Sequence, residues 1–209
     1  MSPDLTRRGY LAVTAAAGGA ALAGCSDDVT ADPDAIDDAD RPALGAENAP
    51  VTVTVFEDYG CPACARFKAQ ALPALIDQYI ETGEVRYLHA DFPIPVDEAW
   101  SHPVANAARE VFFEAGNDAF WLFSSSIYDH QGSYSLDAIE TVAADVADDE
   151  AVGAAARAAA DEEAHSERIA ADRDRGESWG VGGTPAVFVD ETEVDPAYDE
   201  IDSAIQDRL

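Results

Sequence analysis

Two cysteines, separated by two residues at the expected start of a helix, constrain this chain most strongly. Cys61-Pro62-Ala63-Cys64 follows the apolar, β-branched run at 51–56 and opens a segment with helical periodicity. A helix N-terminus carries partial positive charge and free N–H groups, and both favour a thiolate. Pro62 suits the first helical position, where a backbone N–H would have no partner. A strand that leads into CxxC at a helix start therefore predicts thiol–disulfide chemistry.

The first 24 residues have the pattern of an export signal. Paired arginines at 7–8 precede an Ala/Gly-rich run at 10–24, which is too short and too weakly apolar for a membrane-spanning helix of about 20 residues. This order predicts a twin-arginine signal over residues 1–24. Leu22-Ala23-Gly24-Cys25 resembles a lipoprotein processing box, so we expect Cys25 to become the lipid-modified first residue of the mature chain.

An acidic tether is expected between that lipid anchor and the folded domain. Residues 25–45 are acidic, contain two prolines and have few large apolar side chains, which is typical of a disordered linker. The anchor would hold the protein at the extracytoplasmic face of the cell membrane, where disulfides persist. With Cys25 lipidated, Cys61 and Cys64 would be the only free thiols.

Charge narrows the range of partners. The chain has 209 residues, of which 42 are acidic and 12 basic, and its net charge is −30 at pH 7. This charge excludes nucleic acid and anionic membrane surfaces as electrostatic partners, so we expect membrane contact through the lipid anchor alone. It is typical of a surface adapted to high salt, where the Debye length falls to about 3 Å at 1 M. The protein is therefore predicted to be halophilic.

The remaining pattern, over residues 46–209, predicts one α/β domain. A strand at 51–57 is followed by a helix from 62 to about 82, bent at Pro73, and a strand at 85–89. Helical periodicity then continues over about 96–176 and ends in a long helix at 149–175. Short strands at 186–189 and 192–194 and a helix at 196–208 complete the domain, so the predicted order is βαβ, a helical block, then ββα.

A second motif makes the pattern specific. In Gly182-Gly183-Thr184-Pro185-Ala186, a proline leads directly into a strand, where it would remove a ladder donor unless its peptide bond were cis. This motif, together with the CxxC and the helical insert, closely resembles the DsbA-like branch of the thioredoxin fold. Other segments resemble that branch as well, namely 56–62, Asp91-Phe92-Pro93, His102 with the alanines that follow it, and 116–121.

The resemblance implies a thioredoxin-like fold with an all-helical insertion between its βαβ and ββα halves. It implies that Cys61 is the exchange-competent cysteine, that Cys64 is its buried partner, and that the two form a redox-active disulfide. Thr184 and Pro185 would form a wall facing the CxxC and bind an extended substrate segment, with Pro62 and Ala63 beside them.

Two departures from the family pattern bear on redox strength. The most oxidising relatives carry a histidine where this chain has Ala63, and some carry an acid where it has Val55. We therefore expect an intermediate reduction potential, because alanine supplies no charge to stabilise the thiolate. Asp58 and Glu57 lie nearer the cysteines and are candidate proton relays, although either would also fit a solvated loop.

The predicted function is extracytoplasmic thiol–disulfide exchange with exported proteins, in disulfide formation or isomerisation. A membrane redox partner would reset the pair, and no cofactor or metal is expected. Two alternatives stay open at this point. A CxxC module could bind copper through its two thiolates, since zinc would need four ligands. A redox-inert, substrate-binding lipoprotein could keep the fold without using the cysteines.

Overall fold

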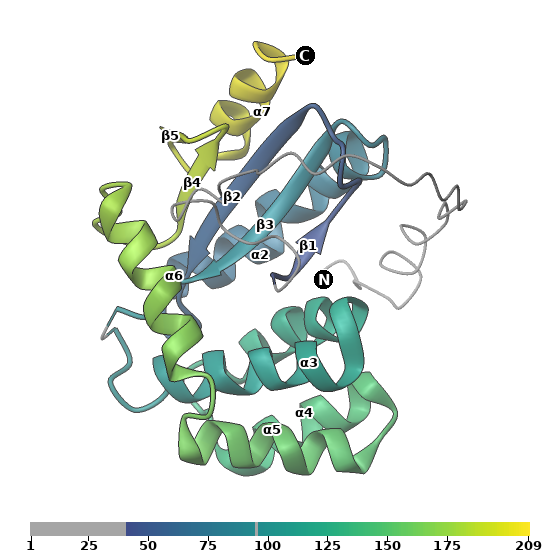
Figure 1. Ribbon diagram of the computed structural model, residues 1–209, viewed down its shortest axis with the longest axis vertical. Helices are drawn as coiled ribbons and strands as arrows, with labels where there is room; N and C mark the ends of the chain where they lie inside the picture. The colour runs from purple at the N-terminus through teal and green to yellow at the C-terminus, as the bar shows by residue number, and fades with distance from the viewer. Residues whose placement is uncertain (1–40, 95) are drawn as a thin grey trace, which may run out of the picture.

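A computed structural model describes residues 41–94 and 96–209 (Figure 1). The predicted export signal at 1–24, Cys25 and most of the predicted tether therefore lie outside the described residues. Within the described part of the chain, no helix is long and apolar enough to cross a membrane.

A five-stranded mixed sheet in the order β1-β3-β2-β4-β5 organises the domain. Its strands are β1 (Ala43–Leu44), β2 (Val51–Glu57), β3 (Val85–Asp91), β4 (Ala186–Val189) and β5 (Thr192–Val194). The central strand β2 runs parallel to β3 and antiparallel to β4. β2 and β3 are buried almost throughout, as their nearly continuous apolar sequences predict for strands covered on both faces. The predicted α/β class is confirmed, and β2 to β5 follow one another along the chain as the βαβ and ββα halves predicted.

Helices α2 and α7 contact each other and lie behind the sheet in the view of Figure 1. The helix α2 (Pro62–Leu75) continues through Pro73 into the π-helical turn η2 (Ile76–Ile80), and α7 (Tyr198–Gln206) closes the chain. Gly83 follows η2 with a φ of +80°, a conformation that ends a helix at little cost only in glycine. This layer brings the start of α2 to the end of β2.

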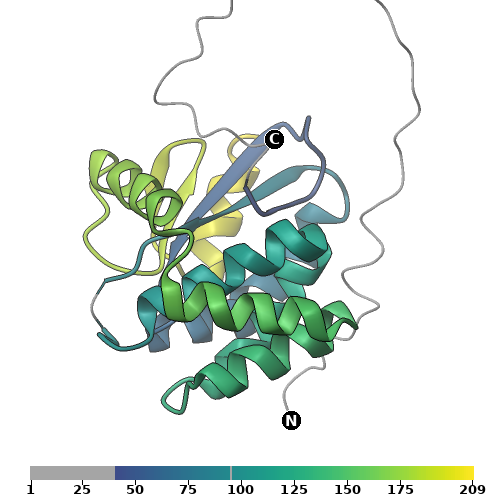
Figure 2. The same ribbon diagram turned by 60° about the horizontal axis from the view of Figure 1, so that its bottom comes forward.

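The helical insertion comprises α3 (Ser101–Ser126), η3 (Ile127–His130), α4 (Leu136–Ala147), α5 (Glu150–Glu162) and α6 (Ser166–Ser178). Helices α3, α4 and α5 pack together as a block beside the sheet, whereas α6 returns to the sheet and contacts β3 (Figure 1, Figure 2). Gly116 interrupts α3 with a φ of 85°. The hydroxyl of Ser135 caps α4 by accepting the N–H of Ala138 at 3.1 Å.

The single helix predicted at 149–175 is wrong, because the chain forms α5 and α6 with a turn between them. Glu163 ends α5 in a left-handed conformation with a φ of 52°. The backbone N–H of His165 then donates to Asn106 of α3 at 2.6 Å, which anchors the turn. No glycine or proline marks residues 163–165, and this bond to a distant residue is invisible in local sequence.

The folded domain begins before residue 46, which corrects the predicted end of the tether. Ala43 and Leu44 form the edge strand β1, paired with β3, and Leu44 is buried. The N–H of Ala43 donates to Asn117 of α3 at 3.0 Å, and the indole of Trp121 donates to the carbonyl of Ala43 at 3.1 Å. A strand of two residues has no periodicity to detect, so only the partners reveal it.

Candidate active site

Cys61 and Cys64 lie where β2 gives way to α2, and both are free thiols. Cys61 is the N-cap residue of α2 and Pro62 follows it at the helix start, as the sequence predicted. Gly60 precedes them at a point where the backbone lies close to Ser101. A Cβ at this position would lie 2.4 Å from the hydroxyl oxygen of Ser101, so any other residue would force its neighbours to shift. The sequence therefore places the first cysteine at the helix start and the second one turn further into the helix, and both side chains are buried, Cys64 completely.

The Cys61 thiol is strongly acidified. The hydrogen bond from Cys64 lowers its pKa most, against the opposing effect of partial burial, and the helix N–H groups of Cys64 and Ala63 lower it further. Together they bring the pKa of Cys61 to about 5, against an ordinary value of about 8.5. Cys61 is therefore a thiolate at neutral pH in the reduced protein, when Cys64 stays protonated.

Cys64 has the opposite surroundings. Its side chain is fully buried, and the backbone N–H of Asp58 donates to its sulfur at 3.5 Å. Burial raises the pKa of Cys64 far above its usual range, and the hydrogen bond to Cys61 and the charge of Glu57 raise it further. Cys64 is thus a poor nucleophile and an internal thiol.

The Thr184–Pro185 peptide bond is cis, as predicted, and the segment lies against the CxxC. The thiol of Cys61 donates to the carbonyl oxygen of Thr184 at 3.2 Å, although the two residues are 123 positions apart. The hydroxyl oxygen of Thr184 is buried without a hydrogen-bond partner in the described structure. The fold therefore assembles one face from the two motifs that the sequence singled out.

A groove of about 380 Å³ adjoins this face. We define the groove by its lining residues: Ala63, Arg66, Phe67, Gln70, Ala71, Pro185, Pro196, Ala197 and Tyr198. Pro62 is exposed next to it and Ala63 is half-buried. Of the four residues predicted to face a substrate, Ala63 and Pro185 line the groove, whereas Pro62 and Thr184 border it in sequence.

Asp58 is buried, so the alternative of a solvated loop acid is wrong for it. Its carboxylate accepts the N–H of Gly60 at 2.7 Å and the N–H of Ile94 at 3.0 Å. Burial raises the pKa of Asp58, although hydrogen bonds from Ser101, Gly60 and Ile94 oppose this effect. Asp58 therefore ties the loop after β3 to the approach of the CxxC while remaining easier to protonate than an ordinary aspartate.

Glu57 is also buried and not solvated. One carboxylate oxygen accepts from the ammonium of Lys68 at 2.8 Å and lies 2.9 Å from Nδ1 of His89. Burial alone would raise the pKa of Glu57, but Lys68 and His89 outweigh it and lower the pKa. The other oxygen, Oε1, is buried without a hydrogen-bond partner among the described residues. Glu57 is therefore an ionised carboxylate close enough to Cys64 to affect its pKa.

Sequence reasoning missed the series of buried ionic contacts that continues from Glu57. We call it the buried charge chain, and it comprises Lys68, Glu57, His89, Asp91, Arg109, Asp172 and Arg41. His89 contacts Asp91 at 3.0 Å, Asp91 contacts Arg109 at 2.5 Å, and Arg109 contacts Asp172 at 2.6 Å. Both ring nitrogens of His89 face carboxylates, so both hydrogen bonds form only when the ring carries two protons.

One signal could have pointed to this chain. Lys68 is the only lysine in 209 residues, and its position seven residues after Cys61 puts it near the CxxC. Its side chain is nearly fully buried and its ammonium lies 5.0 Å from the ring centroid of Trp121. A rare cation on the otherwise apolar inward face of a helix requires a buried acid, but the sequence does not say which one.

The helical insertion also supports the loop before Cys61. Tyr134 and Gln131 both donate to the carbonyl oxygen of Tyr59 at 2.9 Å, and Tyr128 donates to that of Asp58 at 3.4 Å. The carbonyl of Asp58 also accepts the N–H of Cys61 at 3.0 Å, so these bonds add side-chain donors to the buried backbone of this loop. The insertion therefore fixes the backbone that leads into the CxxC.

Comparison with known proteins agrees with this geometry. The family model described as Thioredoxin matches residues 37–207. The probable disulfide bond formation protein D of Bacillus cereus is 29% identical over 174 residues, which cover 80% of this chain and 78% of that protein. The disulfide bond formation protein D of Bacillus subtilis is 27% identical over 177 residues, covering 81% and 77%.

Solved structures give the same fold. Oxidised BdbD from Bacillus subtilis has a TM-score of 0.74 at 24% identity and covers 82% of this chain and 94% of its own. DsbA from Chlamydia trachomatis has a TM-score of 0.71 at 20% identity and covers 79% and 88%.

The chain belongs to the thioredoxin family, in its DsbA-like branch, and the predicted fold class is confirmed. It is a thiol–disulfide oxidoreductase, as its disulfide-forming relatives and its fold together show. Within residues 41–94 and 96–209, no group of three or more His, Cys, Asp or Glu side chains is arranged to hold a metal ion. The alternative of a copper module therefore has only the two cysteines in its favour.

Proposed function

We propose that this protein introduces disulfides into exported proteins through the Cys61–Cys64 pair. The observation that carries the proposal is the contrast within the pair: Cys61 lies against Thr184 and has a pKa of about 5, whereas Cys64 is completely buried and has a strongly raised pKa. A stable Cys61 thiolate favours the reduced enzyme and so makes the enzyme disulfide a stronger oxidant. The relatives named for disulfide bond formation support the same direction.

The exchange needs two steps. A substrate thiolate attacks Sγ of Cys61 in the enzyme disulfide, the Cys61–Cys64 bond breaks, and Cys64 leaves with the electron pair and takes up a proton. A second substrate thiolate then attacks the substrate sulfur of the mixed disulfide, and Cys61 leaves as a thiolate. The substrate loses two electrons and gains one disulfide, while the enzyme pair is reduced.

Asp58 and Glu57 are proposed to handle the proton that Cys64 requires. The charge of Glu57 raises the pKa of Cys64, so this thiolate leaves well only when a proton reaches it. Asp58 donates its backbone N–H toward the Cys64 sulfur and has a carboxyl group with a raised pKa. Asp58 is therefore the better proton donor. Glu57 makes that proton necessary, because its charge disfavours a Cys64 thiolate.

Thr184 and Pro185 are proposed to bind the substrate backbone. The carbonyl oxygen of Thr184 lies 3.2 Å from Sγ of Cys61. Neither the Cys61 thiolate nor a Cys61–Cys64 disulfide has an S–H group to donate to it, so that carbonyl is free to accept an N–H from an extended substrate segment. Such pairing resembles the addition of one strand to a sheet edge.

We also propose an intermediate redox potential. A pKa of about 5 for Cys61 lies between the values of about 7 in thioredoxin and about 3.5 in DsbA. Ala63 supplies no charge to lower it further. The potential should therefore fall between about −270 and about −120 mV.

Placement in the cell is part of the proposal. The twin-arginine pattern at 7–8 supports export, and the processing box ending at Cys25 supports a lipid anchor at the extracytoplasmic membrane face. Each turnover leaves the cysteine pair reduced, so an oxidising membrane partner must reset it. The net charge of −30 supports function in high salt.

Mixed-disulfide trapping tests the proposal directly. With a reduced, unfolded client protein and an oxidant, the Cys64→Ser variant should accumulate a mixed disulfide through Cys61, and Cys61→Ser should accumulate none. Equilibration of the native protein with glutathione buffers in high salt gives the potential. Equal trapping by both variants, or a potential at or below about −270 mV, would overturn the oxidase proposal.

A further inference from the structure

The two sides of the groove beside the CxxC carry opposite charges, and the exchange reaction as proposed does not involve these charges. Its inner end is formed by Ala63 and Pro185, next to the reacting sulfur, and its floor includes the buried side chain of Phe67. One wall is the exposed side of α2, from Ala63 to Gln70, and the other is the segment at 196–198 before α7. A substrate segment leaving Cys61 along the groove would therefore contact both walls.

Arg66 is the only charged residue among those that line the groove, and its side chain is exposed. Within the part of the chain that the structure describes, Arg66 and Arg175 are the two basic residues without a side-chain hydrogen bond, ion pair or ring contact. In a chain of net charge −30, a cation without an acidic partner at the site of exchange is available to a ligand.

The opposite wall has the opposite charge. Asp195 and Asp199 are exposed on either side of the lining segment at 196–198, and Glu200 follows in the first turn of α7. A substrate carboxylate would be repelled from that side and attracted to the α2 side. The groove therefore favours one orientation of an acidic segment, with its carboxylate toward Arg66.

We propose that Arg66 is a specificity-determining residue, which selects substrates with an acidic side chain close to the reacting cysteine. This inference rests on the proposed function and names its substrate class: an extended segment that combines a carboxylate with an apolar side chain for the Phe67 floor. Arg66 is three residues beyond Ala63, a rise of about 4.5 Å along α2. An extended chain advances about 3.3 Å per residue, so the acid should lie within about two residues of the cysteine.

Activated peptides test this selection without any assumption about redox direction. Each peptide has one cysteine flanked by Phe and is activated as a mixed disulfide with nitrothiobenzoate; the residues two before and two after the cysteine are both Glu or both Lys. In the full chain carrying Cys64→Ser, the Cys61 thiolate attacks the peptide sulfur, that disulfide breaks, and coloured nitrothiobenzoate leaves as a thiolate. The measured quantity is the Glu-to-Lys ratio of second-order rate constants, in which the reactivity of Cys61 cancels.

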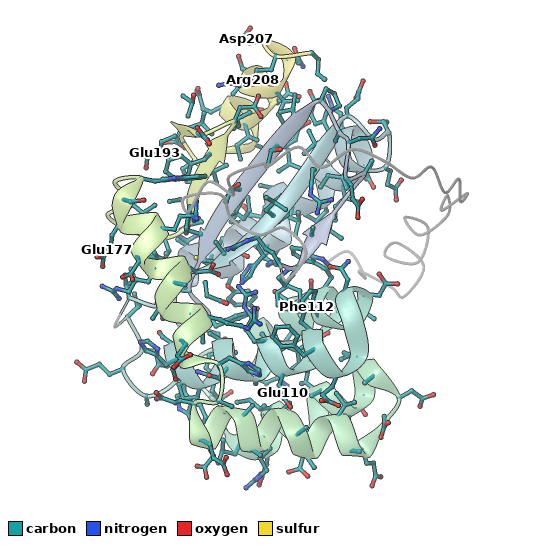
Figure 3. All side chains as sticks on the ribbon, in the orientation of Figure 1. Glu110, Phe112, Glu177, Glu193, Asp207 and Arg208 are labelled. Carbon is teal, nitrogen blue, oxygen red and sulfur yellow. The ribbon has the colours of Figure 1, made fainter. Side chains whose placement is uncertain are left out.

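We expect a ratio of roughly two to five with Arg66 present, as for one exposed ion pair, and a ratio below one in Arg66→Glu. Raising the salt from about 0.1 to 1 M should move both ratios toward one, because the Debye length falls from about 10 to 3 Å. Arg208→Glu makes the same charge change beyond the C-terminal end of α7, whereas the groove contacts its N-terminal end, and should leave the ratio unchanged (Figure 3).

Two failures are distinguishable. A ratio that is the same with Arg66 and with Arg66→Glu, or one that Arg208→Glu shifts as much, would overturn the selection by Arg66 while leaving exchange intact. Release of nitrothiobenzoate at an equal rate after Cys61→Ser would instead overturn the role of Cys61 in the proposed function.

Discussion

Cys61 and Cys64 are three residues apart, yet they lie in two contrasting regions of the molecule. Cys61 is at the helix start, beside the Thr184 carbonyl and the groove, and has a pKa of about 5. Cys64 is one turn further along, fully buried and close to the charge of Glu57. The CxxC pattern alone supplies two thiols of the same chemistry. Their surroundings make Cys61 a reactive thiolate and keep Cys64 a buried, protonated thiol.

The cations around the two cysteines follow the same division. Lys68 lies inside and neutralises Glu57, whereas Arg66, two residues earlier on the same helix, is exposed on the groove side. Burial makes the loss of the inner charge costly, and solvent weakens the outer one. The inner region therefore should govern stability and the outer region should govern recognition.

The largest expected difference is in the reactivity of the two thiols. In the reduced protein at pH 7, iodoacetamide should modify Cys61 more than about a thousandfold faster than Cys64, since only Cys61 is a thiolate. Below its pKa of about 5, the Cys61 rate should fall tenfold per pH unit. Mass spectrometry of pulse-labelled protein measures both rates.

The ionisation of Cys61 also makes the stability of the reduced protein depend on pH. The pKa of Cys61 is lower in the folded than in the unfolded protein, so the reduced form gains stability that is complete above about pH 8.5 and lost as pH falls through about 5. Cys64→Ala removes the main hydrogen bond to the thiolate and should raise the labelling midpoint. A native midpoint near 8 would contradict the contrast between the cysteines.

The next largest effect should come from the inner cation. Lys68→Met leaves the buried carboxylate of Glu57 without its cation and should lower the free energy of unfolding by about 3–5 kcal/mol. The double variant Glu57→Gln/Lys68→Met should recover much of that loss, because no buried charge is left unpaired. Urea unfolding at fixed salt and pH 7 measures both.

A matched control lies two positions away. Arg66→Met makes the same change of charge on the same helix but at an exposed site, so its unfolding free energy should stay close to that of the native protein. If Lys68→Met costs no more than Arg66→Met, the buried and exposed regions do not differ as we infer.

The smallest expected effect concerns the residue between the cysteines. Ala63→His would place an imidazole beside the Cys61 thiolate and lower its pKa. Each unit by which that pKa falls corresponds to about 1.4 kcal/mol and so raises the potential by about 30 mV. Equilibration with glutathione measures the shift, and Ala63→Gln, which is polar but uncharged, serves as the control. No shift with histidine would show that the open side of Cys61 does not set its redox strength.

Local patterns predicted the elements that carry their own signals. The strand before Cys61, the helix after it and the cis proline before β4 were predicted because β-branched runs, helical spacing and X-Pro geometry act over a few residues. The edge strand β1 and the turn between α5 and α6 were missed, because distant partners such as Asn117 and Asn106 define them.

The candidate site divides in the same way. Both cysteines, Thr184 and Pro185 were predicted from sequence, since each lies in a motif with its own chemistry. The burial of Glu57 and Asp58, the buried charge chain and the groove at Arg66 were not predicted, because they join residues from several elements.

The sequence by itself determined the reactive pair, its place at a helix start and the proline that faces it. These features follow from backbone geometry and residue chemistry within short segments. Only the tertiary structure decided how far the pKa values of the two thiols differ, which acid is ionised and which cation is left for a substrate. Those properties depend on burial and on charges brought together from distant positions, and electrostatic energies change most where water is removed.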